Sequence, residues 1–281
     1  MKSYWTLLKP RLSFLVVLST LLSYAYALDE SPGLVAWIIL GVSGFLITGA
    51  ANASNQIIEK NLDALMLRTR NRPMPQGQLA PWQGMMYSFI LLSLGVCALF
   101  IWFNPLAALL SLISFGLYAF IYTPLKPVTP LSVLIGAFPG ALPVLVGCIA
   151  AGNQFHPDYF ILFGIQFFWQ FPHFWAIAWV LDEDYQRAGF RLLPFGREKD
   201  LTAAYYIFIY TVAMVFVSLF PSFLQLTGHW YTITAAVGGI GFLLTTLIHM
   251  KSLNNKSARN VMFYSFFYLP VIQLLLAIDK I

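Results

Sequence analysis

Three oxygen-bearing side chains recur at every fourth position directly after an apolar segment: Asn55, Glu59 and Asp63. Four residues advance an α-helix by about 400°, so these side chains fall within about 80° of one another on one face. Carboxylate and amide oxygens are hard ligands that suit Mg²⁺, which usually keeps several waters and shares its shell with substrate phosphates. These three residues, called the ladder below, therefore predict a magnesium–diphosphate site.

A basic run comes directly after the ladder and consists of Arg68, Arg70 and Arg72. Guanidinium groups bind phosphate oxygens in bidentate fashion, so this run can hold a diphosphate against the metal. The alternative interpretation is a solvated helix end that carries charge. The regular spacing favours a functional site, because ionisable groups at membrane depth are costly and are usually functional.

The composition is that of an integral membrane protein. The chain has 281 residues, of which 59% are hydrophobic and 10% charged, with a mean hydropathy of +0.74. A soluble domain carries roughly 25% charged residues. The apolar blocks approach the roughly 20 residues that a membrane-spanning helix needs, and they lack the alternation of a β-barrel strand. The blocks lie at about 12–28, 33–52, 84–103, 105–123, 131–151, 158–180, 202–220, 230–249 and 261–278.

We therefore expect an all-α polytopic membrane protein with nine transmembrane helices, in a single domain over residues 1–281, around a central cavity that opens to the cytoplasmic side. A cytoplasmic N-terminus and an outside C-terminus leave only Lys280, of sixteen Lys and Arg residues, on the outer side. This agrees with the positive-inside rule, so the basic balance reflects topology and no nucleic-acid partner is expected. The cytoplasmic loops would be 53–83, 124–130, 181–201 and 250–260.

No cleavable presequence is visible in the first span, which favours the plasma (inner) membrane of a prokaryote over an organelle membrane.

The sixth apolar block carries a second group of polar residues. Gln166, Gln170 and His173 share one helix face, and Asp184 continues that face three turns later if the helix persists. Asp182 adds a further carboxylate at the same membrane edge. The alternative for the two glutamines is hydrogen bonding between helices, and for the histidine a packing role. A buried imidazole in a membrane favours a site role.

Both acidic groups, brought to one cavity, would hold one or two Mg²⁺ ions against a diphosphate. Metal and basic residues neutralise such a leaving group, so that its carbon–oxygen bond can ionise to an allylic cation. The spans would supply an apolar tunnel that keeps water from this cation. A membrane transporter is the alternative from another class, but it would need polar groups across the whole bilayer depth.

Several segments resemble one family. Residues 55–73 follow the pattern N-x₃-E-x₃-D-x₂-M-x-R-T-x-x-R-P, which resembles the first signature of UbiA-type intramembrane prenyltransferases. The end of this pattern is similar to that of the protoheme IX farnesyltransferase (heme O synthase) subfamily. Segments 8–11 and 122–130, and the block formed by 169–175 and 184–189, resemble the same subfamily.

The resemblance implies transfer of a farnesyl group from farnesyl diphosphate to a vinyl group of protoheme IX (heme B), giving heme O. It also implies a heme A synthase or terminal oxidase as a partner. The nearest alternative is a UbiA-type enzyme for a quinone precursor or a chlorophyll-type acceptor, against which the 169–175 block argues.

The implied site residues fall into two groups. The ladder and Asp184 would be catalytic, and together with Asp182 they would bind Mg²⁺. The substrate-binding residues would be Arg68, Arg72, Lys126, Tyr122, Gln170 and His173, of which His173 would contact the porphyrin or its iron.

Overall fold

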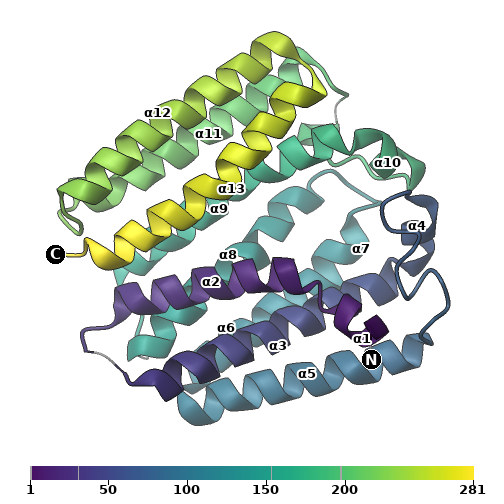
Figure 1. Cartoon of the computed structure of the whole chain (residues 1–281), viewed down its shortest axis with the longest axis horizontal. Coiled ribbons are helices and arrows are strands. Elements are labelled where there is room, and N and C mark those ends of the chain that lie inside the picture. Colours follow the sequence, from purple (N-terminus) through teal and green to yellow (C-terminus); the bar gives the residue numbers. More distant parts are fainter. Residues whose placement is uncertain (1, 31, 153, 197) are drawn as a thin grey trace.

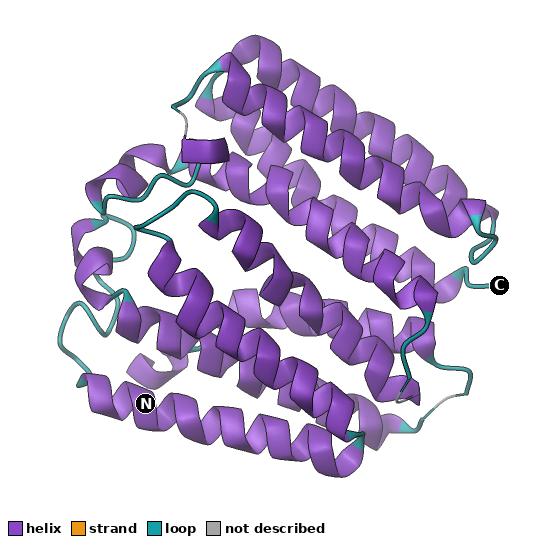
Figure 2. Cartoon of the chain, turned by 180° about the vertical axis from the view of Figure 1, so that it is seen from behind, coloured by secondary structure: helices purple, strands orange, loops and turns teal. Residues whose placement is uncertain are grey.

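The computed structural model describes residues 2–30, 32–152, 154–196 and 198–281, so Arg197 of the expected cytoplasmic loop 181–201 lies outside the described residues. Within these ranges the chain is helical, and Figure 2 draws helices and loops without a strand. Nine described helices are long and apolar enough to cross a membrane, which confirms the expected all-α, multi-pass architecture.

The nine spans agree closely with the expected blocks. They are α2 (Pro10–Ala27), α3 (Leu34–Ile58), α5 (Pro81–Trp102), the continuous segment Pro105–Leu125, α8 (Ser132–Gly152), α9 (Pro157–Val180), α11 (Leu201–Phe223), α12 (His229–Ser252) and α13 (Asn255–Ile278). The fourth span combines α6 (Pro105–Gly116), the π-helical turn η1 (Leu117–Tyr122) and α7 (Thr123–Leu125). The short elements are α1 (Lys2–Leu7), α4 (Lys60–Leu65), α10 (Asp182–Arg187) and the 3₁₀ turn η2 (Pro194–Gly196).

Proline starts several spans, because its missing N–H is not needed in the first turn of a helix. Pro10, Pro81, Pro105 and Pro157 occupy this position. The second span runs six residues beyond its expected end at 52, to Ile58. Its polar end can stay helical and buried because the side chains there find partners, as described below.

Successive spans pack against one another in chain order, and α13 packs against α2, so the helices close into a ring. Short loops favour such antiparallel neighbours. Two further contacts, of α2 with α8 and of α9 with α13, fill the interior. Figure 1 places α1, α4, α7 and α10 at the end of the molecule that carries the N-terminus, and the C-terminus at the other end. We call the first of these the polar end.

Candidate active site

The ladder lies at the polar end, where α3 passes into α4. Glu59 separates the two helices and has the dihedral angles φ −86° and ψ 7°. The hydrogen bonds nevertheless continue, from Glu59 N–H to Asn55 O at 2.9 Å and from Asp63 N–H to Glu59 O at 2.7 Å. The three side chains therefore stay on one side of the chain. They are almost completely buried, with exposed fractions of 1%, 4% and 0% in chain order.

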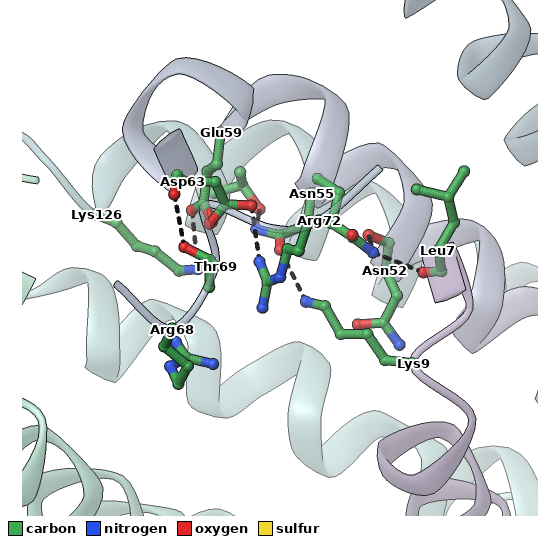
Figure 3. A network of polar contacts seen from close by, with 12 residues as sticks. Leu7, Lys9, Asn52, Asn55, Glu59, Asp63, Arg68, Thr69, Arg72 and Lys126 are labelled. Carbon is green, nitrogen blue, oxygen red and sulfur yellow. Dashed lines mark hydrogen bonds and ion pairs between the residues drawn. The ribbon is translucent and has the colours of Figure 1, made fainter. Parts of the chain in front are cut away.

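Each member of the ladder contacts a different cation (Figure 3). Lys126 Nζ lies 2.9 Å from Glu59 Oε1, and Arg72 Nη1 lies 2.7 Å from Asp63 Oδ2. Lys9 Nζ donates to Asn55 Oδ1 at 3.0 Å. The cations come from three segments: the turn before α2, the loop after α4 and the end of α7. Buried charges need such partners, because an isolated ion in a low dielectric is very costly.

Lys9 is a site residue that the spacing argument missed. It lies 46 residues from Asn55 and has a left-handed φ of 46°, so no periodicity connects the two. Burial is the main cause that lowers the pKa of Lys9 to about 7, and the charges of Arg72 and Lys126 lower it further. Three cations crowded in a buried place are suited to an anion. The sequence feature that could have identified Lys9 is its position directly before the proline that starts a span.

Two carboxamides of α3 fix the backbone that leads into Lys9. Gln56 Nε2 donates to the carbonyl of Leu7 at 2.8 Å, and Asn52 Nδ2 donates to the carbonyl of Leu8 at 3.3 Å. Both side chains are 1% exposed. These bonds help to explain why the polar end of α3 is stable inside the protein, since both buried amide nitrogens donate to backbone carbonyls.

The donor set of the ladder fits Mg²⁺. Asp63 Oδ1 is buried and has no hydrogen-bond partner among the described residues, although Oδ2 is paired with Arg72. Asn55, Glu59 and Asp63 would hold the ion, and water and phosphate oxygens would supply its remaining ligands. The described part of the chain contains no group of three or more His, Cys, Asp or Glu side chains placed to hold a metal by themselves. These residues can therefore hold Mg²⁺ only in a coordination shell that water and substrate phosphate oxygens share.

The structure uses Asp184 and Asp182 in another way. The helix that was expected to continue their face ends at Val180, and Leu181 (φ −104°, ψ 14°) separates α9 from α10. Asp184 accepts the backbone N–H groups of Leu67 and Arg68, while Asp182 accepts Gln186 Nε2 at 2.9 Å. Neither carboxylate is among the residues that line the cavity.

A large cavity extends from the ladder into the ring of spans. It encloses about 1910 Å³, including the part that opens outward, and its walls are mainly apolar. A second, apolar chamber of about 760 Å³ adjoins it and shares Leu12, Val16, Tyr118 and Gly140 as walls.

The predicted substrate-binding residues all line the large cavity. The ammonium group of Lys126 lies over the ring of Tyr122, 4.7 Å from its centroid. Gln170 Nε2 donates to Ala137 O on α8 at 2.8 Å, so this side chain also joins two helices. Arg68 is exposed toward the cavity mouth, and its guanidinium makes no hydrogen bond or ion pair with any described residue.

His173 has a tautomer that its neighbours determine. Its Nδ1 lies 2.8 Å from Ser265 Oγ, and that hydroxyl donates its single proton to Met262 O at 2.7 Å. Nδ1 must therefore carry a proton and donate it to Ser265, which leaves a lone pair on Nε2. Trp169 stacks on His173 with ring centroids 4.4 Å apart and donates to Ser265 O. Ser265 on α13 was not identified from the sequence.

Comparison with known proteins decides the family. Residues 16–269 match the UbiA prenyltransferase family. The chain belongs to this family. It is therefore a prenyltransferase, and the ladder and cavity are its candidate active site.

Relatives at higher identity come from one group of this family. A protoheme IX farnesyltransferase of Cytophaga hutchinsonii is 41% identical over 100% of this chain and 98% of its own. One of Christiangramia forsetii is 42% identical over 97% of this chain and 91% of its own.

Two solved structures share the fold at lower identity. Digeranylgeranylglyceryl phosphate synthase has a TM-score of 0.81 and 19% identity, covering 99% of this chain and 97% of that one. A UbiA homologue from Archaeoglobus fulgidus, bound to GPP and Mg²⁺, has a TM-score of 0.70 and 16% identity, covering 97% of this chain and 99% of that one.

Proposed function

We propose that this prenyltransferase transfers a farnesyl group from farnesyl diphosphate to a vinyl group of protoheme IX (heme B), giving heme O. One observation carries the proposal that the donor substrate is a diphosphate: a buried ladder with three cations around it at the mouth of a large, mainly apolar cavity. The proposal that heme is the acceptor is supported by relatives that match this chain over nearly its whole length and are named protoheme IX farnesyltransferase.

Arg68, Arg72 and Lys126 would hold the diphosphate oxygens, and the three ladder residues would hold Mg²⁺. When bound, Mg²⁺ neutralises the charge that develops on the leaving diphosphate. The carbon–oxygen bond of farnesyl diphosphate then breaks with its electron pair on the diphosphate. The vinyl π electrons form the new carbon–carbon bond, and water adds to the resulting cation and loses a proton, which gives the hydroxyl group.

The apolar walls would shield the farnesyl cation from water until the vinyl group reacts. The adjoining chamber of about 760 Å³ supports a place for the farnesyl chain, because its lining is mostly aliphatic and aromatic. In the lining of the large cavity, Trp169 and His173 would offer a ring face and the Nε2 lone pair to the porphyrin. A neutral imidazole nitrogen is a common ligand of heme iron.

The direct test uses the purified protein with heme B, farnesyl diphosphate and Mg²⁺, followed by mass spectrometry of the extracted hemes. We expect a heme that has gained a farnesyl group and one hydroxyl group. Turnover of a phenolic acceptor without a farnesylated heme would contradict the proposal. The role of His173 can be tested separately, since His173→Ala should change the absorption spectrum of bound heme B. Phe160→Leu, at an exposed position of α9 that does not line the cavity, should not change it.

The same proposal includes a membrane orientation. The polar end would face the cytoplasm of a cell whose plasma membrane holds the enzyme, in agreement with the positive-inside distribution of lysine and arginine. The whole chain would act as one enzyme domain.

A further inference from the structure

In the loop between the ladder and Arg72, two backbone N–H groups have no acceptor within the loop itself. Met66 is extended (φ −88°, ψ 132°), and a short helical turn begins after it. The N–H groups of Thr69 and Arg70 both donate to Met66 O, at 3.2 and 2.9 Å. The N–H groups of Leu67 and Arg68 point out of this turn, as the first amides of any helical turn do, and need an acceptor from elsewhere.

Asp184 supplies that acceptor from the other polar loop. Leu67 N–H donates to Asp184 Oδ1 at 2.6 Å, and Arg68 N–H donates to Asp184 Oδ2 at 3.2 Å, across 117 and 116 residues of sequence. One carboxylate thus binds two successive amides, as the side chain of an N-cap residue does within its own helix. Its negative charge also suits the positive end of the turn.

The consequence concerns Arg68, which belongs to the capped turn. Its side chain lines the cavity and has no described partner, whereas Lys9, Arg72 and Lys126 each contact a ladder residue. Figure 3 shows Arg68 drawn without a dashed contact, beside the cluster that the other cations form with the ladder. Arg68 is therefore a cation available to a ligand, provided that its backbone is held in place.

The two loops also touch through apolar side chains. Met66, Ala188 and Phe190 are buried together, with exposed fractions of 2%, 5% and 2%. Such packing keeps the loops together but is non-directional. The hydrogen bonds that Leu67 N–H and Arg68 N–H donate to Asp184 fix the direction of the turn.

We propose that Asp184 is a positioning residue: it caps the turn after the ladder from across the molecule and so aims Arg68 at the diphosphate. This inference rests on the diphosphate half of the proposed function and not on heme as the acceptor. It differs from the expectation that Asp184 is a ligand of Mg²⁺, because this carboxylate accepts two backbone amides, pairs with Arg187 and does not line the cavity that the ladder lines.

The first measurement tests whether Asp184 holds the turn after the ladder in place; this interaction is called the clamp below. Full-length protein in detergent is treated with trypsin, and cleavage after the exposed Arg68 and Arg70 is followed by mass spectrometry. Asp184→Ala should speed this cleavage about tenfold, and Asp184→Asn, which keeps one acceptor oxygen, should have a smaller effect. Glu183→Gln is the matched control, since it removes a neighbouring exposed charge that makes no described contact, and it should change nothing. Equal cleavage of all variants would overturn the proposal.

The second measurement separates positioning from metal binding. The probe is inorganic pyrophosphate, titrated at saturating Mg²⁺, followed by Mg²⁺ titrated at saturating pyrophosphate. We expect Asp184→Ala and Arg68→Gln each to weaken pyrophosphate binding about tenfold, and the double variant to lose little more than either, because both changes remove the same contact. The Mg²⁺ midpoint should stay at its original value in Asp184→Asn and rise in Asp63→Asn.

A rise of the Mg²⁺ midpoint in Asp184→Asn equal to that in Asp63→Asn would overturn the proposal in favour of a metal ligand. Additive losses in the double variant would also overturn it. Failure of the unchanged protein to bind pyrophosphate would count against the proposed function, and the trypsin measurement would still decide whether the clamp exists.

Discussion

Asp63 has one carboxylate oxygen paired with Arg72 and the other buried without a described partner. This combination explains how one residue can serve both the folded protein and the reaction. The pair compensates a charge that is 0% exposed, and the free oxygen remains for a metal. We therefore expect removal of the carboxylate to have two separable consequences, one for stability and one for activity.

We predict that Asp63→Ala lowers the free energy of unfolding by about 3 kcal/mol, because it leaves Arg72 unpaired in a mostly buried place. The double variant Asp63→Ala/Arg72→Met should recover most of that loss, since it removes the stranded charge as well. Both variants should be inactive. Thermal unfolding in detergent measures the first effect and farnesyl transfer the second.

A double variant no more stable than Asp63→Ala would contradict this account of the pair.

At the scale of helices, the sequence predicted the features that depend on the regular spacing of residues along one helix. The ladder spacing placed Asn55, Glu59 and Asp63 on one side of the chain because the backbone hydrogen bonds persist through the break at Glu59. The same reasoning did not bring Asp184 to that site, because α9 ends at Val180 and no residue type there announces the break.

Other parts of the site depend on contacts between distant segments. The contact of Lys9 with Asn55 follows from a left-handed backbone and from two carboxamides on another helix, neither of which a spacing pattern contains. Ser265, which fixes the tautomer of His173, lies 92 residues away on the last span. Sequence reasoning thus predicts the residues of one helix face better than the partners that complete the site.

Close helix packing at one glycine makes a prediction at this scale. A methyl group on Gly147 of α8 would overlap the carbonyl of Thr20 on α2, and a helix backbone cannot move away as a side chain can. Gly147→Ala should therefore destabilise the protein by about 1–3 kcal/mol. Gly152, at the end of the same helix, has nothing within 4 Å of such a methyl group.

Gly152→Ala is the matched control and should leave the thermal midpoint unchanged. Equal midpoints for the two variants would show that the close contact of α2 with α8 does not limit stability.

For the whole molecule, an odd number of spans among the described residues separates the two chain ends, and Figure 1 places the site at the end that carries the N-terminus. The orientation can be tested with cysteines, because the natural ones interfere little. Cys148 is buried, and Cys97 is exposed on a span and can be replaced by serine.

In a Cys97→Ser background, we predict that Ala64→Cys in α4 reacts with an impermeant maleimide only in inside-out vesicles. Gln154→Cys, in the loop between α8 and α9, should react only from the outside of intact cells. Both positions are exposed in the structure, so access should depend on the side of the membrane alone. The reverse pattern would contradict the proposed orientation.

The contacts between ladder and cations also bear on selectivity. The site contains its own counterions, because Glu59 pairs with Lys126 and Asp63 pairs with Arg72. A free phosphate that arrives alone must draw Lys126 or Arg72 away from its carboxylate and leave that carboxylate unpaired in a buried place, which costs about 3–5 kcal/mol. A metal–diphosphate complex brings both signs together and meets no such penalty. The requirement for electroneutrality would then disfavour free anions at the site and favour the metal–diphosphate substrate.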